Sequence, residues 1–182
     1  DFGCGTGAQT SFFAPHFPRV VGADVDAKYL RHFRRQASLA TALPLLYDGH
    51  CLPMASAGVD YAISFEVLEH VTSESDALAE LHRVIRPGGA LAMSVPTRWW
   101  IFETHGAKLP RLPWNRGPFF SWLPKRFHDR YARARIYRRR EIVAKLEEFG
   151  FRVEQSTYIT APMDVVSWAP LQSALRNTLF RG

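Results

Sequence analysis

The stretch that decides the fold is the heptapeptide DFGCGTG at residues 1–7. Glycines at alternate positions after the end of a strand allow the backbone to turn sharply and to approach a ligand without intervening side chains. Their spacing is G-x-G-x-G, which differs from the G-x-G-x-x-G that is usual for NAD. The motif indicates a ligand-binding turn between a strand and a helix, although taken alone it could also be a purely structural turn. Since a strand needs about five residues, we expect the first strand to be truncated in this sequence.

Beyond this motif, the apolar pattern alternates between strands and helices. Asp26 is placed to cap a helix over residues 27–37, and SESD at residues 73–76 has the form of a capping box ahead of a second helix. Gly150 stands where a left-handed residue would end a third helix. Alternating strands and helices predict one α/β domain over residues 1–182, with a mostly parallel sheet covered on both faces. The expected strands are residues 19–24, 43–47, 59–65, 90–95 and 151–159.

A carboxylate at the end of the second expected strand points to a nucleoside ligand. Asp24 lies about 20 residues after the glycines, where an acid can accept hydrogen bonds from both hydroxyls of a ribose. A helix cap is the alternative role for such a residue, but Asp26 is better placed for it. Because several classes of nucleoside-binding enzyme share this feature, it supports a nucleoside ligand without identifying which one.

Three further stretches narrow the choice. They are YDGHCLP at residues 47–53 followed by VDY at 59–61, FEVLEHV at residues 65–71, and RVIRPGG at residues 83–89. In this order, after the glycine motif and Asp24, they resemble the class I S-adenosylmethionine-dependent methyltransferases, and most of all the small-molecule enzymes of quinone and natural-product biosynthesis. The resemblance covers residues 1–95 well and residues 138–160 loosely. It implies a Rossmann-like fold, S-adenosylmethionine as the cofactor and methyl transfer as the reaction.

The same resemblance implies which residues bind the cofactor. In order along the chain they are Asp1, Gly3 and Gly5 for the methionine end, Asp24 for the ribose, Val25, Asp48, Gly49 and His50 for the adenine, and Phe65 and Glu66 near the sulfonium. Gly3, Gly5, Gly49 and His50 would act through their backbone groups. The carboxylate of Asp48 would accept a hydrogen bond from the adenine amino group.

A general base is needed only if the acceptor must lose a proton. Candidates near the expected pocket mouth are Glu66, His70, His105 and His128, although a single histidine is more often structural than catalytic. A metal site is an alternative, because Glu66, Glu69 and His70 form an E-x-x-E-H pattern that resembles metal-binding quinone and small-RNA methyltransferases. Since no fourth ligand is evident, no metal is expected, and His70 is expected to order the turn after its strand.

Residues 96–137 interrupt the alternation with a stretch rich in Pro, Trp, Phe and Arg. Long loops without regular structure are uncommon unless they are functional, so we predict a lid or substrate element. Residues 96–140 hold 12 of the 23 Lys and Arg residues but only two of the 17 Asp and Glu residues. Aromatic residues interleaved with arginine suit an anionic membrane, nucleic acid, a lipophilic or phosphorylated acceptor, or a solvated helix face. Because four of the five tryptophans lie here, we favour a small apolar acceptor or membrane contact over nucleic acid.

Composition sets the remaining expectations. Cys4 and Cys51 have no metal-type spacing and are too few for a disulfide framework, so free thiols in a reducing, cytoplasmic compartment are expected. Peripheral contact with a membrane through residues 96–140 would be compatible with that location. Two other functions stay open. One is a nicotinamide-dependent oxidoreductase, which the glycine spacing disfavours, and the other is a non-catalytic relative that binds the cofactor or only keeps the fold.

Overall fold

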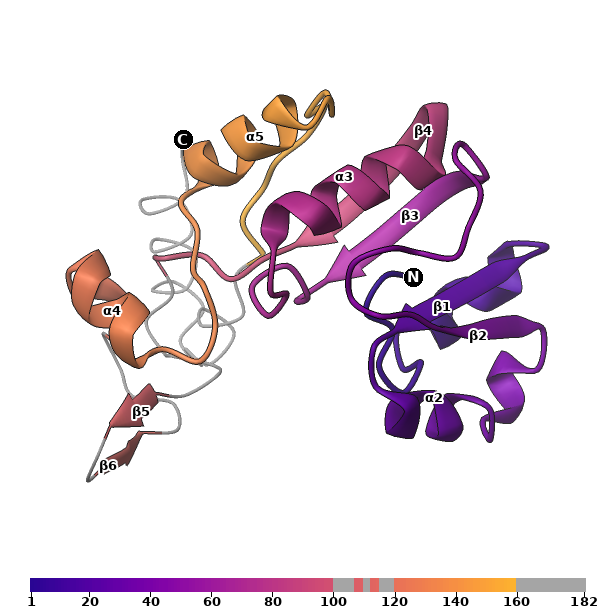
Figure 1. Ribbon diagram of the computed structural model, residues 1–182, viewed down its shortest axis with the longest axis horizontal. Helices are drawn as coiled ribbons and strands as arrows, with labels where there is room; N and C mark the ends of the chain where they lie inside the picture. Colours follow the sequence, from indigo (N-terminus) through magenta and orange to yellow (C-terminus); the bar gives the residue numbers. More distant parts are fainter. Residues whose placement is uncertain (100–106, 110–111, 115–119, 160–182) are drawn as a thin grey trace, which may run out of the picture.

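The sheet is built from parallel strand pairs that are joined through the N-terminal residues. The computed structural model describes residues 1–99, 107–109, 112–114 and 120–159 (Figure 1). In one pair β1 (Val20–Asp24) runs parallel to β2 (Ala42–Leu46), and in the other β3 (Val59–Phe65) runs parallel to β4 (Ile85–Ser94).

Phe2 connects these two pairs. It forms a parallel bridge with Ala23 of β1, and its N–H donates to the carbonyl of Ile63 in β3 at 2.8 Å. The order across the sheet is therefore β2, β1, the short stretch around Phe2, β3 and β4. The glycine loop leaves the sheet at its centre, between β1 and β3.

Helices cover both faces of the sheet, as the alternating pattern predicts. Ala23 of β1 belongs to the hydrophobic cluster that contains Leu78 and Ile142, whereas a Cβ on the preceding Gly22 would meet Phe33. Because neighbouring residues of a strand point to opposite faces, the helices that carry these partners lie on opposite sides of the sheet (Figure 1). The helices concerned are α3 (Glu74–Val84) and α5 (Arg139–Glu148) on one side and α2 (Ala27–Phe33) on the other, with α1 (Thr10–Phe13) and the 3₁₀ turns η1 (Ala14–His16) and η2 (Ala37–Leu39) completing this part.

The helix boundaries follow the local signals in the sequence. The Asp26 side chain accepts from the N–H of Lys28 at 2.6 Å at the start of α2. The Ser73 hydroxyl accepts from the N–H of Asp76 at 3.2 Å at the start of α3. Gly150, with a φ of +87°, follows α5 in the left-handed conformation. The cap at Asp26 and the left-handed Gly150 are confirmed, whereas α2 ends at Phe33 and not at residue 37. At Ser73 the bond from the N–H of Asp76 is the half of the predicted capping box that the structure shows.

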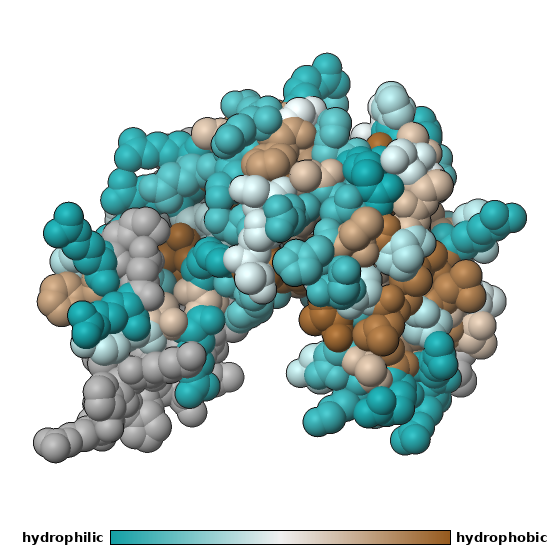
Figure 2. All heavy atoms as spheres, viewed as in Figure 1, coloured by the Kyte–Doolittle hydropathy of each residue, from teal (hydrophilic) through white to brown (hydrophobic). Residues whose placement is uncertain are grey.

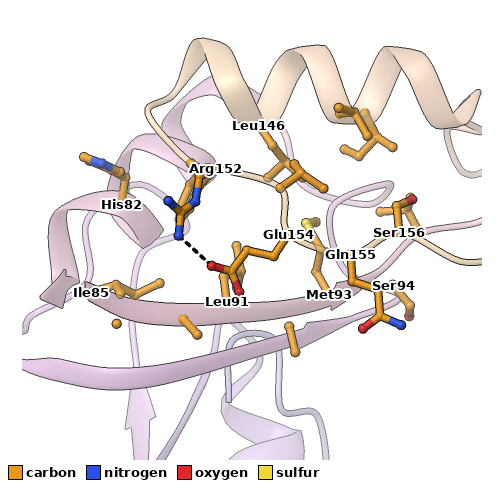
Figure 3. A pocket seen from close by; sticks show the side chains of 18 of the residues that line it. His82, Ile85, Leu91, Met93, Ser94, Leu146, Arg152, Glu154, Gln155 and Ser156 are labelled. Atoms are coloured by element: carbon orange, nitrogen blue, oxygen red, sulfur yellow. Dashed lines mark hydrogen bonds and ion pairs between the residues drawn. The ribbon is translucent and has the colours of Figure 1, made fainter. Parts of the chain in front are cut away.

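The expected strand at residues 151–159 is wrong, because this segment carries no strand ladder. A cavity of about 1510 Å³ separates it from β4, with Leu91 and Met93 on one wall and Leu146 of α5 on another (Figure 3). Strands must approach to about 4.8 Å to share hydrogen bonds. The cavity therefore keeps the segment out of the ladder of β4 (Figure 3). The side chains of Arg152 and Glu154 within the segment form an ion pair at 2.7 Å.

The segment after β4 forms its own small elements away from the sheet (Figure 1). β5 (Ala107–Leu109) and β6 (Leu112–Trp114) make an antiparallel pair. The 3₁₀ turn η3 (Phe120–Trp122) and α4 (Lys125–Tyr131) follow. In the part of the chain that the structure describes, no helix is long and apolar enough to cross a membrane.

The surface differs between these regions. Figure 2 shows hydrophobic side chains gathered over the part of the molecule that holds β1 and β2, where Leu43 and Leu46 are exposed. The described side chains around α4 are mostly hydrophilic in the same view. In this view α4 therefore lies on the opposite side of the molecule from the hydrophobic surface over β1 and β2.

Candidate functional site

The glycine loop is packed on one side and open on the other. Gly3 has a φ of +72°, and a Cβ there would lie 2.4 Å from Cγ2 of Val67. Gly5 has a φ of +55°, and a Cβ there would meet nothing within 4 Å. Only glycine fits at Gly3, because both the backbone conformation and the neighbouring side chain exclude a larger residue. The space beside Gly5 is where a ligand can approach the backbone.

Asp1 presents a buried carboxylate to this loop. The hydroxyl of Thr10, which is completely buried, donates to Asp1 Oδ2. Asp1 Oδ1 is buried and has no hydrogen-bond partner among the described residues. A buried carboxylate oxygen without a partner is costly, so it fits a ligand that brings a cationic group, such as an α-ammonium. No pattern in the sequence predicts that Thr10 holds this carboxylate.

Asp24 ties the end of β1 to the glycine loop. It is 8% exposed, and its Oδ2 accepts from the N–H of Gly5 at 2.7 Å. Its Oδ1 accepts from the N–H of Asp26 at 2.8 Å. The carboxylate is thus fixed in orientation by two backbone groups, as a ribose-binding acid needs to be. The helix cap itself is Asp26, which leaves Asp24 for a ligand.

The expected adenine-binding residues come together beside Asp24. Oδ1 of Asp48 accepts from the N–H groups of His50 and Cys51 at 2.8 and 2.9 Å. These backbone donors lower the pKa of Asp48, so it stays ionised. A Cβ on Gly49 would lie 3.6 Å from Cγ1 of Val25. The loop and the exposed Val25 side chain therefore form adjoining parts of one surface.

The turn after β3 carries the remaining site residues. Glu66 has a φ of +56°, which is uncommon for a residue with a side chain, and such conformations concentrate at functional sites. Its N–H donates to the carbonyl of Ser94 at 3.1 Å, and the Ser94 hydroxyl donates to Glu66 Oε1 at 2.9 Å. The end of β4 thus holds Glu66 in place beside Phe65. Sequence reasoning did not identify Ser94.

Glu69 and His70 occupy different environments on the same turn. Glu69 is 2% exposed, and burial, with a smaller contribution from the nearby Glu66 carboxylate, raises its pKa to about 7 despite backbone donation. His70 is exposed, with Nε2 at 3.8 Å from Glu69 Oε1. No group of three or more His, Cys, Asp or Glu side chains within the described ranges is arranged to hold a metal ion.

Of the two histidine candidates in the segment after β4, only His128 lies among the described residues. His128 is 1% exposed on α4, and its ring lies 5.3 Å from that of Phe120. It is a packed side chain within the segment. His105 lies outside the described residues. Glu66 and His70 are the candidates that the fold brings to the carboxyl end of β3.

The cavity between β4 and residues 151–159 is not this site. It runs along the outer edge of β4, and of the expected cofactor residues it reaches only Phe65 and Glu66. The residues expected to bind the cofactor instead line the carboxyl ends of β1, β2 and β3, where the strand order reverses about the first strand. Ligands of open α/β sheets bind at such a point. We therefore assign the site from the carboxylates and the glycine loop, not from cavity size.

Comparison with known proteins agrees with this geometry. A family model described as a methyltransferase domain matches residues 1–93. A probable S-adenosylmethionine-dependent methyltransferase of Mycolicibacterium smegmatis is 30% identical over 162 residues, which make up 85% of this chain and 51% of that protein. A malonyl-[acyl-carrier protein] O-methyltransferase of Pseudescherichia vulneris is 32% identical over 107 residues, or 59% of this chain and 42% of that protein.

Solved structures share the fold. An S-adenosylmethionine dependent methyltransferase from Mesorhizobium loti matches with a TM-score of 0.65 at 18% identity, covering 96% of this chain and 83% of that one. The chain belongs to the class I S-adenosylmethionine-dependent methyltransferase family, and the predicted Rossmann-like fold is confirmed. It spans about half the length, or less, of the first curated relatives that it matches.

Proposed function

We propose that this chain binds S-adenosylmethionine at the glycine loop and transfers its methyl group to a small, apolar or membrane-associated acceptor. The observation that carries the proposal is Oδ1 of Asp1, a buried carboxylate oxygen without a partner among the described residues, next to a loop whose open side begins at Gly5. A positively charged amino acid end fits this position. When bound, the cofactor supplies a methyl group on a sulfonium for in-line displacement.

In this proposal the chain's own residues bind the cofactor and orient it. We infer that Asp24 accepts hydrogen bonds from the ribose hydroxyls, since two backbone N–H groups already fix its carboxylate. The adenine would lie along Val25 and Gly49, with Asp48 Oδ2 accepting from its amino group. Asp48 Oδ1 is already used by the loop, whereas Oδ2 accepts no hydrogen bond within the described ranges. Positioning of this kind can supply much of the acceleration of a displacement.

The turn after β3 would face the reacting atoms. Glu66, which Ser94 orients at 2.9 Å, is the base that we propose for an acceptor that must lose a proton. His70 on the same turn is exposed and can take that role for a larger acceptor. An acceptor that carries a lone pair without a proton would need neither.

The acceptor class rests on the segment of residues 96–137, which we propose as the lid and substrate element. Trp122, Leu123 and Phe127 are 49%, 40% and 60% exposed, and the exposed Arg126 and Arg130 share α4 with Phe127. Exposed aromatic and aliphatic side chains among arginines match a surface that contacts anionic lipid at the level of its headgroups. Nucleic acid is the second candidate, because arginines and aromatic rings also suit a single strand.

The first test is calorimetric titration of S-adenosylhomocysteine into the full chain, with NAD as the control ligand. Binding of S-adenosylhomocysteine alone supports the proposal. Binding of NAD alone would overturn the proposal in favour of a nicotinamide-dependent enzyme. Binding of neither ligand would overturn it and leave only an inherited fold.

The acceptor class is tested by co-sedimentation with vesicles that contain anionic phospholipid, at low and high salt. We expect binding that falls only in part as salt rises, and a clear loss in Phe127→Ser. Phe12→Ser is the matched control, because Phe12 is 74% exposed on α1 in another part of the molecule. Binding to a single-stranded oligonucleotide that vanishes at high salt, with none to vesicles, would favour nucleic acid instead.

A further inference from the structure

Arg135 reaches inward to the turn after β3, across a long distance in sequence. Its Nη1 donates to the carbonyls of Val71 at 2.6 Å and Leu68 at 3.5 Å, and its Nη2 donates to the carbonyl of Thr72 at 3.3 Å. Its backbone N–H donates to the carbonyl of Glu69 at 3.3 Å. One residue thus binds four carbonyls of a turn that spans residues 66–72. A guanidinium, with five donors in a fixed planar arrangement, is suited to this task.

The turn that Arg135 holds is in direct contact with the glycine loop. The Val67 side chain fills the place that a Cβ of Gly3 would occupy, so the two segments meet without a gap. Leu68, which is 1% exposed, anchors the turn in the core. A shift of the turn would therefore move the surface on which the glycine loop rests, together with Glu66 at its start.

Arg135 is itself held by a well-connected segment. The N–H of Tyr137 donates to the carbonyl of Pro96 at 3.0 Å, and the N–H of Arg98 donates back to the carbonyl of Tyr137 at 3.0 Å. The Tyr137 hydroxyl donates to Glu74 at the start of α3. Lys145 Nζ of α5 donates to the other oxygen of Glu74 at 2.5 Å. The segment that returns from α4 to α5 is thus fixed to the end of β4 and to α3.

We propose that Arg135 is a positioning residue, which fixes the turn of residues 66–72 against the glycine loop and so couples the lid segment to the cofactor site. The inference rests on the proposed cofactor site at that loop. Arg135 lies within a basic run whose other described arginines include the exposed Arg133 and Arg140.

The test compares Arg135→Ala with Arg133→Ala, which removes the same charge from the same segment at an exposed position. Calorimetric titration of S-adenosylhomocysteine should show an affinity roughly 3- to 30-fold lower in Arg135→Ala and unchanged in Arg133→Ala. Added guanidinium ion at millimolar concentration should restore part of the lost affinity, which loss of fold stability alone would not allow. Amide hydrogen exchange at residues 67–72 should be faster in Arg135→Ala.

Wild-type affinity in Arg135→Ala, or equal losses in the two variants, would overturn the inference. Should Arg135→Ala not fold, Arg135→Lys supplies the test, because an ammonium reaches fewer carbonyls and should give a smaller loss of affinity and faster exchange at residues 67–72. Wild-type affinity and exchange in Arg135→Lys would also overturn it. Failure of the wild-type chain to bind S-adenosylhomocysteine would instead contradict the proposed function.

Discussion

The Asp48 loop in residues 1–95 and Arg135 in the segment from residue 96 to residue 159 use charged groups in different ways. Asp48 accepts from backbone N–H groups two and three residues away. Arg135 and Lys145 bind groups 64 and 71 residues away. The contacts of Asp48 are local, and therefore visible in a motif, whereas those of Arg135 and Lys145, like the bond of Asp24 to Gly5 19 residues away, exist only once the chain has folded.

The largest expected effect tests the contact on which the first region depends. Gly3→Ala should lower the free energy of unfolding by roughly 2–5 kcal/mol, because the new Cβ meets Val67 and the φ of +72° is unfavourable. Gly5→Ala, which meets no neighbour within 4 Å, should lose only roughly 1–2 kcal/mol. Urea denaturation without ligand measures both. Gly5→Ala should nevertheless lose affinity for S-adenosylhomocysteine. Equal losses of stability in Gly3→Ala and Gly5→Ala would mean that the loop does not rest on Val67.

A second prediction concerns the pH dependence of stability. The pKa of Glu69 is raised from 4.5 to about 7 in the folded chain, so the native state holds a proton that the unfolded state releases. Stability should therefore fall as pH rises from about 4.5 to about 7, by on the order of 3 kcal/mol. Glu69→Gln should abolish this slope. Parallel profiles of unfolding free energy against pH for the two proteins would contradict the prediction.

A substitution at Asp24 tests the proposed ribose contact in the first region. Asp24→Ala should weaken binding of S-adenosylhomocysteine by about 1.5–3 kcal/mol, because charge-assisted hydrogen bonds to the ribose are lost. Asp26→Ala should lose about 1 kcal/mol of stability as a helix cap while cofactor affinity stays unchanged. Titration calorimetry measures the loss of affinity, and thermal unfolding measures the loss of stability. Unchanged affinity in Asp24→Ala would show that the ribose assignment is wrong.

The smallest effect tests the link between the two regions. Tyr137→Phe removes the hydroxyl that donates to Glu74 and should cost roughly 1–2 kcal/mol of unfolding free energy. A double-mutant cycle with Glu74→Ala measures this interaction, because each single variant removes the hydrogen bond between the two residues. Strictly additive losses would mean that the segment after β4 is held by other contacts.

Local signals account for what the sequence predicted well. The caps at Asp26 and Ser73 and the left-handed Gly150 were all visible, because each depends on a residue type within a few positions of a helix end. The strand at residues 151–159 was predicted from its apolar pattern and is absent, because a strand also requires a neighbour at hydrogen-bonding distance. An apolar pattern shows which secondary structure a segment can form. Whether a strand finds a neighbour to pair with depends on the rest of the fold.

The sequence by itself determined the family and the parallel sheet, and it singled out the carboxylates that we propose bind the cofactor. These features follow from glycine spacing, strand-end acids and caps, which act over short separations. Only the tertiary structure decided that Asp24 holds Gly5, that Ser94 orients Glu66, and that Arg135 turns inward while Arg133 stays exposed. An arginine in a basic run has the same local pattern whether it meets solvent or carbonyls, and only packing of distant segments supplies the carbonyls.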